Sequence, residues 1–271
     1  MRQFISVANS KFPTSKANII PVIPELLTAK FVDEQLSFAA KNKYDLVVGL
    51  NYANVAPFVL NLANLGALTI SGRENSGRSN FIKYLVSSMG KRNPGSVEVY
   101  VTDNVERKLS TLQSCDSVKS YSIVTDDVIE NIKAVEQELE RRYSALMNGN
   151  DDVFDTSSLI VLIINNVDAL AVISDDMNAF DSYKNIVGRY KNLNVCVIVG
   201  DFPNTNISYS SPELMRMLRD SRHFLYFDDM DAMKILDLPL SVIRQYKKPI
   251  RHGDCYYIND NDFSKIKSAV L

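Results

Sequence analysis

The stretch ISGRENSGRSN, from Ile70 to Asn80, combines glycines, hydroxyls and cations at the spacing of a phosphate-binding loop. Gly72, Gly77 and Ser79 fit the pattern G-x-x-x-x-G-K-S/T, in which the glycines let backbone N–H groups approach an anion closely. Arg78 stands at the position of the lysine. The residues expected to contact a bound nucleotide are Gly72, Arg73, Glu74, Asn75, Ser76, Gly77, Arg78, Ser79 and Asn80.

Arginine at position 78 keeps the positive charge of the motif but changes its geometry. The flat guanidinium is bulkier than an ammonium group and directs its donors differently, so it can bind phosphate while positioning it poorly. Ser79 is the hydroxyl expected to contact Mg²⁺, weakly. The motif taken alone leaves open a glycine turn between a strand and a helix that binds no ligand.

Two amides follow the most apolar run of the sequence, Leu159 to Ile164. In nucleotide hydrolases, carboxylates near such a strand end assist the metal and position the attacking water. Asn165 and Asn166 have the size of aspartate but no negative charge. General-base catalysis contributes about 10²- to 10⁴-fold, so we expect slow or undetectable turnover and assign no catalytic residue. Asp168, three residues beyond the strand, is the alternative metal contact.

The elements around these motifs alternate between strand and helix. Valines alternate with other residues from Ser96 to Asp103, and apolar residues recur every three or four positions in the helix from Asp126 to Asn148. This alternation predicts an α/β fold with a mostly parallel central sheet flanked by helices. Other strands are expected at 65–72, 159–164, 194–200, 222–227 and 253–259, the last at an edge, and other helices at 77–89 and 177–190.

The domain organisation is predicted to be simple. Residues 1–64 contain short apolar runs interrupted by prolines and are expected to form an irregular lead-in that packs on the core. Residues 65–271 are expected to form the α/β domain, so the chain is a single domain overall. No internal repeat is found.

The composition excludes several classes of function. Thirty Lys+Arg against 32 Asp+Glu give a formal charge of −2, which does not resemble the basic footprint of a nucleic-acid-binding protein. Cys115, Cys196 and Cys255 form no C-x-x-C pair, and only His223 and His252 are present, so a disulfide framework and a histidine-rich metal site are not expected. No run approaches the roughly 20 apolar residues that cross a bilayer.

Several segments together resemble a known family. They are NLGALTISGRENSGRSNFIKYL, EQELERRYSAL at Glu136–Leu146, LIVLIINNVDAL and the late GDCYYI. The combination resembles the FtsK/SpoIIIE class of RecA-like P-loop NTPase motor domains. More narrowly, IPVIPELL, VVGLNYANVAPFVLNL and GDCYYINDNDFSKIKSAVL resemble the last ATPase module of the EssC/EccC coupling proteins of type VII secretion.

The resemblance implies a cytoplasmic piece of a larger protein anchored in the bacterial cell membrane, with ATP and Mg²⁺ as cofactors. Its implied partners are secreted small helical effector proteins, preceding ATPase modules of the same chain and further copies in a homo-oligomer, with no DNA expected. Gly72, Gly77, Arg78 and Ser79 map onto the phosphate loop of the family, and Asn165 and Asn166 map onto its acidic pair. The departures at Arg78, Asn165 and Asn166 put hydrolysis in doubt but not the fold.

Three hypotheses follow from these observations. The first is a degenerate ATPase module, a pseudo-ATPase that recognises substrates or regulates protein export. The second is an active ATPase completed by neighbouring modules, and the third, a DNA-translocating motor, conflicts with the charge balance. Segments Ser211–Asp220 and Asp228–Ile243 could offer apolar contacts to a protein partner, or could pack into the core; their candidate residues are Leu214, Met217, Leu218, Met233, Leu236 and Leu238.

Overall fold

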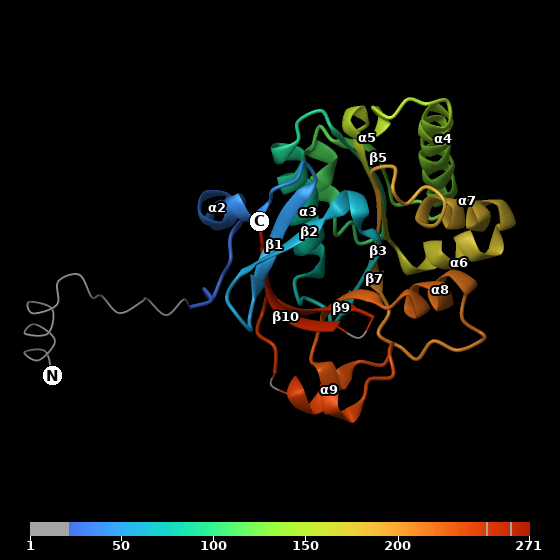
Figure 1. The fold of residues 1–271 in the computed structure, drawn as a ribbon. Coiled ribbons are helices and arrows are strands. Elements are labelled where there is room, and N and C mark those ends of the chain that lie inside the picture. The colour runs from blue at the N-terminus through green and yellow to red at the C-terminus, as the bar shows by residue number, and fades with distance from the viewer. Residues whose placement is uncertain (1–21, 248, 261) are drawn as a thin grey trace, which may run out of the picture.

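A single ten-stranded sheet forms the centre of the computed structural model, which describes residues 22–271 except 248 and 261. Its strand order is β2-β1-β10-β9-β8-β3-β7-β6-β4-β5. Figure 1 shows the sheet at the centre of the molecule, with helices packed around it. The strands are β1 (Asp45–Asn51), β2 (Pro57–Asn61), β3 (Gly66–Gly72), β4 (Val97–Asp103), β5 (Val118–Ser122), β6 (Leu159–Asn165), β7 (Val195–Phe202), β8 (His223–Phe227), β9 (Asp254–Asn259) and β10 (Asp262–Ser268).

The six strands from β8 to β5 in this order are parallel, as the alternation of strands and helices predicts. All residues of β6 are buried, as expected for a strand covered on both faces. The remaining strands continue the sheet from β8 through antiparallel pairings. The predicted α/β architecture with a mostly parallel sheet flanked by helices is therefore confirmed.

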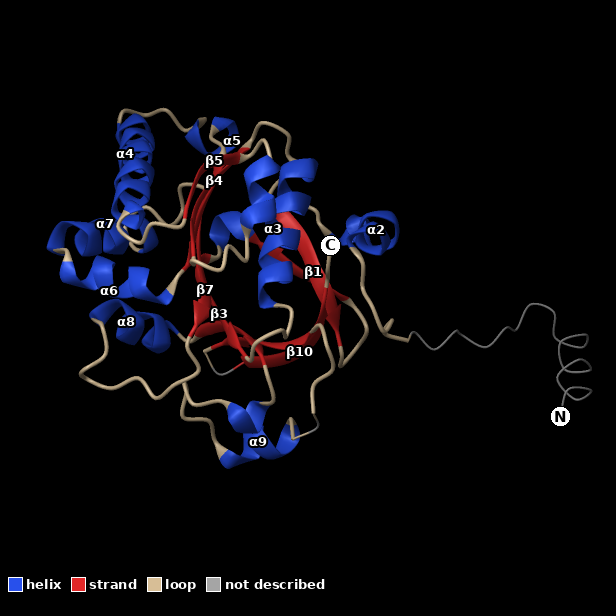
Figure 2. Cartoon of the chain, turned by 180° about the vertical axis from the view of Figure 1, so that it is seen from behind, coloured by secondary structure: helices blue, strands red, loops and turns tan. Residues whose placement is uncertain are grey.

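Helices cover both faces of the sheet, which curves around α3 (Arg78–Arg92) in the view of Figure 2. Helices α4 (Asp127–Met147), α6 (Val167–Asp175), α7 (Met177–Val187) and α8 (Glu213–Ser221) lie on the opposite face. Each face has its own apolar core. The short helices are α2 (Ala29–Phe31), α5 (Val153–Thr156) and α9 (Leu240–Gln245).

Two expectations about the ends of the chain are wrong. Residues 45–61 are not irregular, because β1 and β2 form a hairpin that joins the sheet. Pro57 starts the outermost strand, where a missing backbone N–H is tolerated. The strand at 254–259 is not an edge strand, since β9 lies between β8 and β10. The boundary near residue 65 stays a prediction, and the part of the lead-in before residue 22 lies outside the described residues.

Candidate functional site

The predicted phosphate loop connects β3 to α3 at the carboxyl edge of the parallel strands. Gly72 has φ 142°, and a Cβ there would lie 2.6 Å from the backbone carbonyl carbon of Phe227, so no other residue fits. Gly77 has φ 107° at the N-cap of α3. The loop is closed internally by Ser76, whose Oγ donates a hydrogen bond to the carbonyl oxygen of Arg73 over 2.8 Å. The glycine framework is therefore required by the geometry of the turn.

An open pocket of about 550 Å³ lies over this loop and the first turn of α3. Seven of the nine predicted contact residues, Glu74 to Asn80, line it, whereas Gly72 and Arg73 do not. The side chains of Lys83, Glu106, Lys108 and His252 complete the lining. Lys83 lies on the helix that follows the loop, whereas Glu106, Lys108 and His252 come from segments with no predicted connection to the loop.

Arg78, the first residue of α3, forms an ion pair inside the protein. Its Nη1 lies 2.7 Å from Oδ1 of Asp201, and only 12% of the Arg78 side chain is exposed. Asp201 belongs to β7, the neighbour of β3, and Lys108 and Asn104 also contact its carboxylate. Sequence reasoning missed Asp201, although its position directly after the apolar run at 194–200 places it at the same sheet edge as the loop.

Asn165 is buried at the end of β6 and is bonded to a carboxylate on the next strand. Its Nδ2 donates to Oδ1 of Asp103 over 2.7 Å. The other oxygen of Asp103 accepts hydrogen bonds from the backbone N–H of Leu109 and the hydroxyl of Tyr121, each over 2.7 Å. Burial, followed by the bond to Asp103, raises the pKa of Tyr121, so it stays protonated and donates. The carboxylate of Asp103 is thus held by neutral donors.

Asn166 caps a helix. Its Oδ1 accepts a hydrogen bond from the backbone N–H of Asp168 over 2.9 Å, at the N-terminus of α6. Asp168 is exposed in the first turn of that helix. Within residues 22–271 as described, no group of three or more His, Cys, Asp or Glu side chains could hold a metal ion. The loop therefore fits an anion, whereas the strand end supplies amides already engaged in other contacts.

The two segments considered for partner binding contribute mainly to the core. Leu214, Leu218 and Leu236 are buried, and Met217, Met233 and Leu238 are partly buried against the same core. The alternative that these residues pack inside the domain is therefore correct.

Comparison with known proteins supports the resemblance seen in the sequence. Residues 38–164 match the model of the FtsK/SpoIIIE family, so the match begins within the lead-in and ends in β6. No curated protein matches the sequence. No helix among the described residues has the length and apolar character needed to span a membrane.

Several solved structures share the fold at low sequence identity. The cytoplasmic domain of EssC aligns with a TM-score of 0.66 and 18% identity, covering 99% of this chain and 51% of that one. EssC from Geobacillus thermodenitrificans (ATPases 2 and 3) aligns with a TM-score of 0.67 and 16% identity, covering 99% of this chain and 49% of that one. Thermomonospora curvata EccC (ATPases 2 and 3), in complex with a signal sequence peptide, aligns with a TM-score of 0.67 and 12% identity. This alignment covers 99% of this chain and 47% of that one. The chain thus spans about half the length of these structures, and at these identities they show the fold alone.

Proposed function

We propose that this chain, which carries an FtsK/SpoIIIE-type domain, is a degenerate ATPase module of a type VII secretion motor. It binds adenine nucleotide weakly at the loop from Gly72 to Asn80, with Ser79 as the contact to Mg²⁺, and hydrolyses it slowly or not at all. Its task is the recognition of secreted substrates or the regulation of their export. It works as a cytoplasmic part of a larger protein anchored in the bacterial cell membrane.

The observation that supports this proposal most is the contrast between the loop and the strand end. The loop keeps the two glycine conformations that let a backbone surround an anion. The amide of Asn165 is bonded to Asp103, and the oxygen of Asn166 caps α6. Neither amide can accept a proton from water, and the chemical step loses its base while the binding cradle remains.

Calorimetric titration with ATP and Mg²⁺, combined with a phosphate-release assay, tests the nucleotide part. We expect weak binding that Arg78→Ala weakens further, and phosphate release at the level of a protein-free control. Brisk turnover that Arg78→Ala abolishes would show that this is an active enzyme.

The second candidate is an ATPase that becomes active only beside neighbouring modules. The half-length coverage of structures described as ATPases 2 and 3 favours this alternative, because a second module can supply an arginine in trans. Comparing the turnover of the isolated chain with that of a tandem protein separates the two candidates. Turnover in the tandem protein that depends on Arg78 and Ser79 of this chain would favour the second.

Secreted small helical proteins are the partners to test. The complex of Thermomonospora curvata EccC with a signal sequence peptide motivates the choice. Titration of candidate helical-hairpin proteins into the chain should reveal binding that does not require nucleotide turnover. Failure of every candidate, together with clear turnover, would favour a motor instead. Binding to duplex DNA that weakens steeply with salt would indicate the DNA-translocating alternative.

A further inference from the structure

The backbone of β7 is bulged at the point where it faces the phosphate loop. Thr69 of β3 pairs with Val199, but Ser71 pairs with Phe202, so Gly200 and Asp201 together face one residue of β3. Asp201 has φ 53° within this bulge, and Ser71 fixes the bulge by donating from its buried Oγ to the carbonyl oxygen of Phe202 over 2.7 Å. Such bulges redirect a side chain, often next to a functional site.

The redirected carboxylate of Asp201 reaches the cations of the loop pocket. Its Oδ1 lies 2.7 Å from Nη1 of Arg78, and its Oδ2 lies 3.7 Å from Nζ of Lys108. Asn104 donates to the same Oδ2 over 3.2 Å. Lys108 is also paired with Glu106 over 2.7 Å. Two cations that line the pocket are therefore already neutralised by carboxylates of the protein itself.

A phosphate bound at the N-terminus of α3 would need the same guanidinium. Arg78 is the first residue of that helix and lines the pocket, so phosphate oxygens and the Asp201 carboxylate compete for its donors. The carboxylate of Asp201 also repels any anion that binds beside Arg78. Both effects oppose nucleotide binding and act through one side chain.

We propose that Asp201 is an internal competitor of phosphate that holds Arg78 and keeps the affinity of the loop for nucleotide low. This inference rests on the proposed function, because it concerns the same loop. It assigns the weakness of the site to a carboxylate at the end of β7 rather than to the replacement of lysine by arginine alone.

The test is calorimetric titration of the full chain with inorganic pyrophosphate and with ADP, each with and without Mg²⁺. Asp201→Asn removes the charge while keeping a residue that tolerates positive φ. Asp201→Gly is the second variant, since glycine adopts this conformation freely. We expect both to bind pyrophosphate and ADP on the order of tenfold more tightly, the scale of one charge-assisted hydrogen bond.

Two controls identify the cause of such a gain. Asp228→Asn removes the same charge beside the same loop, but Asp228 lies 3.9 Å from Arg73 and not on Arg78, so its effect should stay below about threefold. In a protein that already carries Arg78→Gln, Asp201→Asn should raise the affinity for pyrophosphate and ADP no more than Asp228→Asn does. Thermal unfolding without ligand checks that each variant is folded.

The outcomes separate this inference from the proposed function. If the wild type binds pyrophosphate and neither Asp201 variant binds it more tightly, the inference is wrong and the nucleotide site stands. Loss of Mg²⁺-dependent ADP binding in both variants would instead make Asp201 a metal ligand and would equally overturn it. If the wild type and all variants are folded yet bind neither pyrophosphate nor ADP, the nucleotide part of the proposed function fails together with the inference.

Discussion

The surroundings of Asn165 explain why a neutral side chain stands at this strand end. Its Nδ2 is 2.7 Å from a carboxylate oxygen of the buried Asp103, and a Cβ on Gly200 would lie 2.3 Å from its Oδ1. The amide is therefore enclosed on one side by an acceptor and on the other by backbone. A second carboxylate here would face the first without a donor between them.

Asn165→Asp, which restores the acidic type expected for an ATPase, should therefore destabilise the protein. We expect a loss of about 3 kcal/mol or more in the free energy of unfolding near neutral pH, because an unpaired charge is buried against Asp103. Urea unfolding measures this loss.

Asn166→Asp is the matched control for this prediction. Aspartate can accept the same hydrogen bond from the N–H of Asp168, so the change should stay within about 1 kcal/mol. An Asn165→Asp protein as stable as the wild type, with new Mg²⁺-dependent turnover, would show that the strand end can still hold a catalytic acid.

His223 makes the stability of the protein depend on pH. Burial lowers the pKa of His223, whose Nε2 lies 2.8 Å from the hydroxyl of Tyr257. Between the folded pKa and the ordinary value of 6.5, the unfolded chain binds more protons than the folded one. The free energy of unfolding should therefore fall as the pH drops below about 6.5.

The expected slope is at most about 1.4 kcal/mol per pH unit for one proton. His223→Gln should flatten it, whereas His252→Gln should not, since His252 is exposed and is the only other histidine of the chain. Urea unfolding between about pH 5 and pH 8, where histidine titrates, measures the free energy of unfolding of both variants. Equal slopes in the wild type and His223→Gln would assign the effect to other groups.

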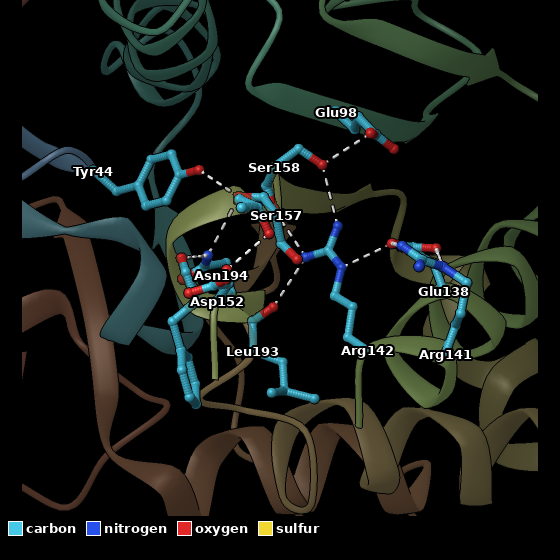
Figure 3. A network of polar contacts seen from close by, with 12 residues as sticks. Tyr44, Glu98, Glu138, Arg141, Arg142, Asp152, Ser157, Ser158, Leu193 and Asn194 are labelled. Atoms are coloured by element: carbon cyan, nitrogen blue, oxygen red, sulfur yellow. Dashed lines mark hydrogen bonds and ion pairs between the residues drawn. The ribbon is translucent and has the colours of Figure 1, made fainter. Parts of the chain in front are cut away.

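At the scale of elements, Arg142 of α4 connects the starts of two parallel strands (Figure 3). Its Nη1 donates to the carbonyl oxygens of Ser158 and Leu193 over 2.8 and 3.0 Å, directly before β6 and close to the start of β7. Glu138 accepts from its Nε over 2.9 Å. The side chain of Arg142 is 2% exposed, so its guanidinium forms these hydrogen bonds inside the protein, away from water.

Replacement of Arg142 by methionine keeps the volume but removes these donors. We expect a loss of about 2–4 kcal/mol in the free energy of unfolding, because two partly buried carbonyl groups are left without a partner. Arg141→Met is the control, since Arg141 pairs with the same Glu138 but is 70% exposed, and its loss should cost about 1 kcal/mol or less. Equal losses in the two variants would show that Arg142 acts only through the ion pair.

The sequence indicated the elements better than their connections. The predicted strands and helices of the parallel half lie within a few residues of their observed ranges, because long apolar runs and helical spacing depend on local sequence. Strand β5 and helices α6 and α8 of the same half were not predicted. Helical spacing did not show that Arg142 is buried, because its contacts depend on residues 16 and 51 positions away. The pairing of Arg78 with Asp201 is equally non-local and could not be derived from the loop motif.

At the scale of the whole molecule, the lead-in supports the helix that carries the phosphate loop. The hydroxyl of the buried Tyr84 on α3 donates to the carbonyl oxygen of Val47 in β1 over 2.6 Å, and Arg92 donates to the carbonyl oxygen of Ala40 over 2.6 Å. Leu46, Val48 and Leu50 of β1 belong to the same apolar core as α3. The lead-in thus completes the face of the sheet on which the loop helix packs.

Close contacts also join β1 to the end of the chain. A Cβ on Gly49 would lie 2.3 Å from the carbonyl oxygen of Lys267, so only glycine allows β1 and β10 to pair there. Lys267 is 3% exposed and lies 3.4 Å from the buried carboxylate of Asp254. Prolines and short apolar runs in the lead-in gave no local sign of this pairing, because its partner is more than 200 residues away.

The predicted boundary at residue 65 can be tested with the fragment of residues 65–271. Without β1, one edge of β10 and the core side of α3 are exposed, and burial of each Val or Leu side chain contributes about 1.5–3 kcal/mol. We expect the fragment to unfold without cooperativity or to associate through the open strand edge, and to lose any nucleotide binding of the full chain. Size-exclusion chromatography and thermal unfolding followed by circular dichroism measure these properties. Full-length Tyr84→Phe, which lacks the hydroxyl that donates to Val47 but keeps the lead-in, should stay monomeric and lose about 1 kcal/mol. A monomeric fragment that unfolds as cooperatively as the full chain would show that residues 65–271 form an independent domain and that the lead-in is an accessory.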